Sequence, residues 1–102
     1  MKWFISQPMK AKKTEEEILA EREQITKAIL EDHPEDEVID SYLKDYEPCD
    51  GNRAMKFLAK SIELLADADI AYFAKGWADA RGCKIEHDIA LAYGLTVIED
   101  NN

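Results

Sequence analysis

The stretch that decides the fold is Phe73–His87, which reads FAKGWADARGCKIEH. Its pattern is typical of the end of a buried strand, followed by a polar loop and the start of a helix. Open α/β sheets bind ligands at junctions of this kind, outside the carboxyl ends of their strands. One carboxylate, Glu86, lies one turn into the expected helix, and another, Asp79, lies in the loop before it. The stretch therefore predicts a ligand site with two groups that could perform chemistry.

Strand and helix patterns alternate along the rest of the chain. Thr14 and Glu17 have the spacing of a capping box at the start of the first helix. Pro34 ends that helix, because the residue before a proline avoids the helical region. Gly94 suits the left-handed position after the last helix. The expected strands are 2–6, 38–42, 70–73 and 95–98, and the expected helices are 14–33, 53–67 and 81–93.

This alternation predicts the fold class. Strands joined through helices are typically parallel, with helices on both faces of the sheet. We therefore expect an α/β protein, a small Rossmann- or flavodoxin-like three-layer fold with a parallel sheet of about four strands, in a single domain over residues 1–102. A sheet this small has exposed edges, and exposed edges favour pairing, so we expect a homo-oligomer.

Charge and composition argue against several classes of partner and site. The 102-residue chain carries a formal net charge of −9, and no apolar run approaches the length of a membrane span. Acidic surfaces repel nucleic acid polymers and anionic membranes, so we expect neither as a partner. The N-terminus lacks a signal-peptide pattern, which favours a cytoplasmic location. Cys49 and Cys83 show no metal-binding spacing, so we expect free thiols, no metal and no cofactor.

Two loops are expected to meet at the carboxyl edge of the parallel sheet. Residues 6–13 follow the first strand and residues 74–82 follow the third, and a helix begins after each of them. Helix N-termini attract anions, and Lys10, Lys12 and Lys13 add positive charge to the first loop. These lysines either help to hold a phosphate or another polar ligand, or form a solvated turn.

Glu86 has two interpretations. It is either one more helical glutamate near a helix N-terminus, or a partly desolvated carboxylate with a raised pKa at the edge of the sheet. The spacing of Ile85, Ile89 and Tyr93 predicts the buried face of this helix, with Glu86 on its border. Asp79 is either the N-cap of the same helix or the second carboxylate of an acid and base pair.

The remaining candidates also have alternatives. Gly82 either makes a tight turn or permits a ligand to approach the backbone. Trp77 either packs on its own loop or stacks on a planar base. Cys83, in the first turn of the helix, either has a lowered pKa or is a small packing residue, which we favour. His87 points elsewhere on the helix and is interpreted as a structural or surface residue.

Three segments carry a family resemblance: Phe4–Met9, Leu64–Phe73 and Gly82–Gly94. Over nearly its whole length the chain resembles a family of short bacterial and phage proteins of unassigned function, which is grouped with the nucleoside 2-deoxyribosyltransferase-like superfamily. The match to the characterised transferases is carried mainly by the third segment. The resemblance implies a single domain of the transferase type and a nucleoside or nucleotide ligand.

The resemblance also implies roles for individual residues. Glu86 takes the place of the glutamate that attacks C1′ of the deoxyribose, which splits one displacement into two easier steps. Asp79 is nearest to the aspartate that precedes that glutamate, and Ser61 replaces the aspartate that contacts the ribose. Substrate contacts are expected from Ser6, Gln7 and Met9 after the first strand, and from Trp77, Gly82 and Cys83 near the third.

The leading hypothesis is therefore a protein that binds a nucleoside or nucleotide and cleaves or transfers its N-glycosidic bond through Glu86. The first alternative is a non-catalytic nucleotide-binding module, a sensor or scavenger. The second is a small assembly protein that keeps the fold and has lost the pocket. An open cavity beside Glu86 would argue against the second alternative.

Overall fold

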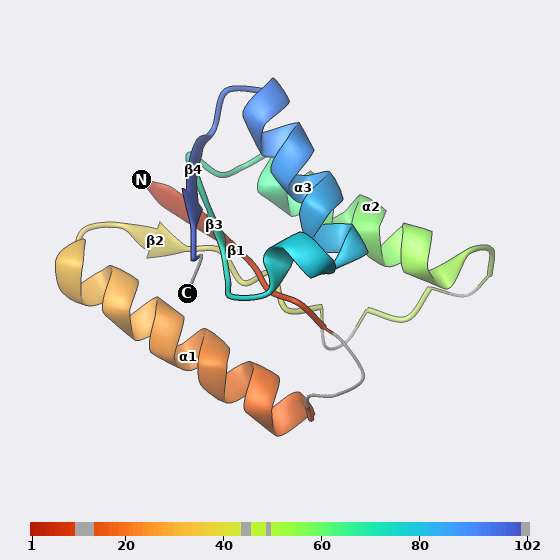
Figure 1. The fold of residues 1–102 in the computed structure, drawn as a ribbon, viewed down its shortest axis with the longest axis horizontal. Coiled ribbons are helices and arrows are strands. Elements are labelled where there is room, and N and C mark those ends of the chain that lie inside the picture. Colours follow the sequence, from red (N-terminus) through yellow and green to blue (C-terminus); the bar gives the residue numbers. More distant parts are fainter. Residues whose placement is uncertain (10–13, 44–45, 49, 101–102) are drawn as a thin grey trace.

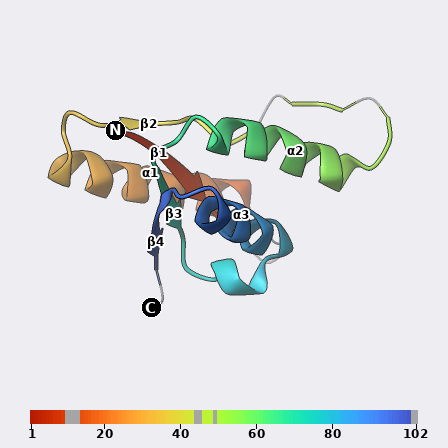
Figure 2. The ribbon, with the colours of Figure 1, turned by 90° about the horizontal axis from the view of Figure 1, so that it is seen from above.

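Four parallel strands form the central sheet. The computed structural model describes residues 1–9, 14–43, 46–48 and 50–100, and in it the strands lie in the order β2-β1-β3-β4. Their bounds are β1 Lys2–Ser6, β2 Glu37–Val38, β3 Ile70–Phe73 and β4 Thr96–Glu99. Seen from above, β2 and β4 are the edges and β1 and β3 the centre (Figure 2). The predicted α/β fold with a parallel sheet of four strands is confirmed.

Helices cover both faces of this sheet (Figure 1). Helix α1 (Glu15–Asp32) lies on one face, where Ile29 packs in a cluster with Trp3 and Ile5. Helices α2 (Arg53–Leu65) and α3 (Arg81–Ala92) lie on the other. The three layers follow from the alternation of side chains along a strand. None of the described helices has the length and apolar character that a membrane span requires.

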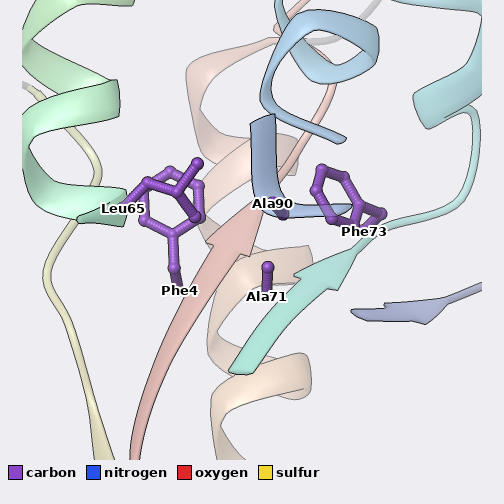
Figure 3. Close-up of a cluster of buried hydrophobic side chains, with 5 residues drawn as sticks. All are labelled: Phe4, Leu65, Ala71, Phe73 and Ala90. Atoms are coloured by element: carbon purple, nitrogen blue, oxygen red, sulfur yellow. The ribbon is translucent and has the colours of Figure 1, made fainter. Parts of the chain in front are cut away.

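The core between the sheet and helices α2 and α3 contains two alanines among larger side chains. Phe4, Leu65, Ala71, Phe73 and Ala90 are each 1% exposed or less. In Figure 3, Ala71 on β3 and Ala90 on α3 face each other, with Phe4 and Leu65 on one side and Phe73 on the other. Alanine is small, so the C-terminal part of α3 can pack directly against β3 at this point.

The capping box at the start of α1 is confirmed. Thr14 Oγ1 accepts a hydrogen bond from the Glu17 backbone N–H at 3.1 Å, and Glu17 Oε1 accepts one from the Thr14 backbone N–H at 3.3 Å. Each bond satisfies a donor that has no partner within the helix.

We expect Thr14→Ala to lower the free energy of unfolding by about 1 kcal/mol, because the Glu17 N–H loses its acceptor. Urea unfolding measures this value. Thr14→Ser is the matched control, since it keeps the hydroxyl group. Equal stability of the alanine and serine variants would show that the cap contributes nothing.

The prediction for the second strand is wrong in length. A strand was expected over 38–42, but β2 contains only Glu37 and Val38, which pair with Lys2 and Trp3. The Ile39 N–H still bonds to Trp3 O at 2.8 Å, and then the Ser41 hydroxyl, rather than a backbone N–H, donates to Ile5 O at 3.2 Å. A side chain therefore replaces the next step of the ladder, and the backbone after β2 leaves the sheet.

The predicted buried face of α3 is also wrong. Ile85 is 36% exposed and Tyr93 is 80% exposed, and Ile89 is only partly buried. The buried residues are Cys83, Glu86 and Ala90, at spacings of three and four. The buried face therefore carries two small side chains and one carboxylate, while Ile89 lies beside it and packs against the core cluster. The other element ends agree with the predictions to within two residues.

Candidate functional site

A cavity of about 610 Å³ lies beside the carboxyl end of β1. Its wall comes from β1 and the residues after it, from Arg22 of α1, from residues 41–43 after β2, and from the first turns of α2 and α3. The volume of this cavity is within the range of small-molecule binding sites. The chain leaves β1 towards α1 on one face of the sheet and leaves β3 towards α3 on the other, and ligands bind where strand order reverses in this way.

The early end of β2 makes room for this cavity. A longer β2 would pair with the end of β1, whereas Ser41, Tyr42 and Leu43 instead line the cavity. The assembly-protein alternative predicted a lost pocket, so the open cavity argues against it.

Glu86 presents its carboxylate to two hydroxyl groups at this cavity. Ser6 Oγ, at the end of β1, donates to Glu86 Oε1 at 2.7 Å, and Ser61 Oγ of α2 donates to Glu86 Oε2. Glu86 is 6% exposed and lines the cavity. The carboxylate is therefore neither in bulk solvent nor sealed away from the cavity, and three elements fix its position.

Burial raises the pKa of the Glu86 carboxyl above its ordinary value, and the hydrogen bonds from Ser61 and Ser6 offset part of this rise. The folded chain therefore holds this proton at a pH where the unfolded chain has released it. The resulting stabilisation is fully present below about pH 4.5, the ordinary value, and is lost as the pH rises through the folded-state pKa.

We therefore expect the parent chain to lose stability relative to Glu86→Gln as the pH rises above 4.5. The neutral amide cannot ionise, so it escapes the cost of a buried charge. Urea unfolding at a series of pH values measures the difference. Asp88→Asn, which removes an exposed carboxylate from the same helix, is the matched control. The same pH trend in both variants would rule out burial of Glu86 as the cause.

Cys83 lies one turn before Glu86 and is buried. Burial raises the pKa of its thiol to about 11, which outweighs the effect of a hydrogen bond with Ser6. The thiol is therefore protonated near neutral pH, and the interpretation of Cys83 as a packing residue holds. Cys49 lies outside the described residues, as do Lys10, Lys12 and Lys13, for which an anion site and a solvated turn were both considered.

Six of the predicted site residues line this one cavity: Ser6, Gln7, Met9, Gly82, Cys83 and Glu86. Gln7 is 5% exposed, and its Nε2 donates to Ile18 O at 2.7 Å and to Glu21 Oε1 at 2.8 Å. These two acceptors fix the orientation of the amide. Gln7 Oε1 is buried without a hydrogen-bond partner among the described residues.

Trp77 and Asp79, by contrast, do not line the cavity. The loop turns at Gly76, whose φ of 88° favours glycine, into the short 3-10 helix η1 (Trp77–Asp79). The Trp77 ring stacks on the ring of His87, with centroids 4.2 Å apart and planes 17° apart. Trp77 therefore packs against α3 and Phe73 rather than on its own loop. His87 is structural, which is one of the two roles expected for it, because it supports the Trp77 ring from α3.

Asp79 does not cap α3, contrary to one of its two interpretations. The N-cap residue is Ala80, which has no side-chain acceptor. Asp79 is exposed and has contacts elsewhere. Gly82 does not make the tight turn, which lies at Gly76. The nearest side-chain atom to a Cβ built at Gly82 is Leu58 Cδ1 at 4.0 Å, so Gly82 has ordinary space around it on the cavity wall.

Two residues of the site were not assigned a role from the residue patterns. Arg22 lies on the face of α1 that carries Ile18 and Ile29, and a charged residue at an apolar spacing was the signal for it. Ser61 was noted only as a replacement within the family pattern, yet it bonds directly to Glu86. Among the described residues, no three His, Cys, Asp or Glu side chains gather in a way that could hold a metal ion.

Comparisons with protein-family models, with curated proteins and with solved structures find no match to this chain. The resemblance to the nucleoside 2-deoxyribosyltransferase-like superfamily therefore stays a prediction. The features of this chain that bear on its function are the cavity and the groups in its wall.

Proposed function

We propose that this protein binds a nucleoside or nucleotide in the cavity and cleaves or transfers its N-glycosidic bond through Glu86. The observation that carries the proposal is a carboxylate in the wall of a cavity of about 610 Å³, held by Ser6 and Ser61. A fixed carboxylate beside room for a sugar is the arrangement that nucleophilic displacement at C1′ requires.

The proposed reaction has two steps. A Glu86 oxygen forms a bond to C1′ of the sugar, and the bond from C1′ to the base nitrogen breaks, with its electron pair leaving on the base. The base takes up a proton from solvent. Water, or the nitrogen of a second base, then forms a bond to C1′ as the bond from C1′ to the Glu86 oxygen breaks; the attacking group loses a proton to solvent, and the Glu86 carboxylate is released. Ser6 and Ser61 orient the carboxylate for the first step and receive it again after the second.

The wall of the cavity favours a nucleobase as the leaving group. Among the described residues that line it, Glu86 is the one carboxylate. O-glycosidases commonly use a second carboxyl group to protonate a poor leaving group. A nucleobase delocalises the departing electron pair over its ring, so it needs less help. The unpaired Gln7 Oε1 adds an acceptor for a hydroxyl or amino group of the ligand.

Incubation of the chain with a panel of deoxynucleosides and their 5′-monophosphates tests the proposal, with chromatography to detect the free base. Release of a base at a rate above the uncatalysed one supports it. A chain that releases no base from any member of the panel would fail as an enzyme.

The second candidate is a nucleotide-binding module without catalysis. Both Glu86 oxygens already accept a serine hydrogen bond, and burial favours the protonated, non-nucleophilic form of this carboxyl. This candidate predicts stabilisation without turnover. A nucleotide at about 100 times its Kd would raise the free energy of unfolding by about 2.7 kcal/mol with no base released.

The setting we propose is a cytoplasmic homo-oligomer that binds neither nucleic acid polymers nor membranes. The net charge of −9 supports the absence of polyanionic partners. Exposed apolar side chains on α3, Leu91 at 57% and Tyr93 at 80%, support association between copies. The free thiol of Cys83 fits a reducing compartment.

A further inference from the structure

Arg22 is a buried cation on the apolar face of α1. It shares this face with Ile18 and Ile29, and at 8% exposed it is almost as buried as they are. It also lines the cavity. A buried guanidinium is costly unless its donors have acceptors and its charge has a counter-charge. The groups around Arg22 should therefore include hydrogen-bond acceptors and a negative charge that offset the cost of its burial.

The described residues supply only part of that compensation. Arg22 Nη2 donates to Ser41 Oγ, which itself donates to Ile5 O. Arg22 Nη1 is buried and has no hydrogen-bond partner among the described residues. Asp40 acts on the guanidinium through its charge, and burial lowers the pKa of Arg22 in spite of it. Within this part of the chain, Nη1 is therefore left without a hydrogen-bond acceptor, and the charge of Asp40 does not compensate for the burial of the guanidinium.

The charges in the cavity wall show the same imbalance. Among the described residues that line the cavity, the charged ones are Arg22, Arg81 and Glu86. Glu86 is satisfied by two serine hydroxyls, and Arg81 is exposed to solvent at the start of α3. Of these three charged residues, the one that is both buried and incompletely hydrogen-bonded is therefore a cation, and it comes from the helix on the opposite face of the sheet from Glu86.

We propose that the ligand carries a phosphomonoester and that Arg22 pairs with this phosphate. The inference rests on the proposed function and makes it narrower, because it names a nucleotide rather than a nucleoside as the ligand. A phosphate supplies both missing elements, an acceptor for Nη1 and a counter-charge. Guanidinium groups suit it because their donors match the spacing of phosphate oxygens. Ser41 holds Nη2, which leaves Nη1 as the donor for the ligand.

Calorimetry with a deoxynucleoside and its 5′-monophosphate tests this inference. Glu86→Gln is used as the background, so that no turnover disturbs the measurement. We expect the monophosphate to bind about ten- to a hundredfold more tightly than the nucleoside, the range of a charge-assisted hydrogen bond. Adding Arg22→Gln should remove most of this preference and leave the affinity for the nucleoside unchanged. Arg53→Gln, at an exposed arginine outside the cavity wall, is the matched control for net charge.

The outcomes separate this inference from the proposed function. Equal affinities for nucleoside and monophosphate would overturn the role of Arg22 and leave the proposed function standing. Equal weakening of both ligands by Arg22→Gln would show a structural role only, and would also overturn it. Binding of neither ligand would defeat both proposals. Where Arg22→Gln fails to fold, Arg22→Lys takes its place: it keeps the charge but not the paired donors of the guanidinium, so an unchanged preference for the monophosphate in this variant would overturn the role of Arg22.

Discussion

Glu86→Gln is expected to lower the rate of base release by about 10³-fold or more, which is the scale of losing a nucleophile. The amide keeps the size of the side chain and can still accept a hydrogen bond, so the cavity keeps its shape. It cannot form the bond to C1′. Chromatography of the free base under single-turnover conditions measures the rate, and mass spectrometry of the parent chain should show a protein heavier by one deoxyribosyl group.

Two further variants make this prediction specific. Ser61→Ala removes one of the two hydrogen bonds to the carboxylate, and we expect a loss of about ten- to a hundredfold. Glu63→Gln alters an exposed glutamate on the same helix as Ser61 and should leave the rate unchanged. A Glu86→Gln variant as active as the parent chain would eliminate Glu86 as the nucleophile, whatever binds in the cavity.

Phe73→Ala is expected to cost about 3–5 kcal/mol in the free energy of unfolding, the usual range for a buried phenylalanine. Phe73 is fully buried at the end of β3. Its ring contacts those of Trp77 and His87, with centroids 5.7 and 5.0 Å away. Truncation would leave a void between the sheet, α3 and η1, because the two alanines nearby cannot fill it.

Tyr93→Ala provides the comparison for Phe73→Ala, since Tyr93 is 80% exposed at the end of α3. We expect its effect to stay within about 0.5 kcal/mol. Urea unfolding of both variants measures the two effects. A loss below about 1 kcal/mol for Phe73→Ala would mean that the core between α3 and the sheet collapses easily around the void.

Local signals in the sequence predicted most of the fold. The apolar run at 70–73 and the capping box at Thr14 depend on neighbouring residues only, and the structure agrees with both. The length of β2 depends instead on whether residues 39–42 find partners on β1. The Ser41 hydroxyl donates to the Ile5 carbonyl oxygen, which a backbone N–H of a longer β2 would otherwise use. The hydrophobic pattern of the sequence does not indicate that this side chain replaces a backbone donor.

The site was predicted less completely than the fold, for a related reason. Glu86 was singled out because it lies one turn into a helix that follows a strand-to-helix junction, on the border of the predicted apolar face. The buried face of α3 was misassigned because the side chains that fit closest to the sheet, Cys83 and Ala90, are small rather than strongly apolar. Ser6 and Glu86 are hydrogen-bonded although they are 80 residues apart in the chain. Residue spacing predicts contacts within one helix or strand, so it could not predict this one.

The two-residue β2 has a consequence for how proteins of this design would diversify. Residues 41–43, which follow β2 and leave the sheet, form one wall of the cavity, and Glu86 lies in another part of the wall, on α3. Insertions or deletions between β2 and α2 would resize the cavity and leave the carboxylate in place. The volume of the cavity would therefore change through this connection alone, while the contacts of Glu86 with Ser6 and Ser61 are kept.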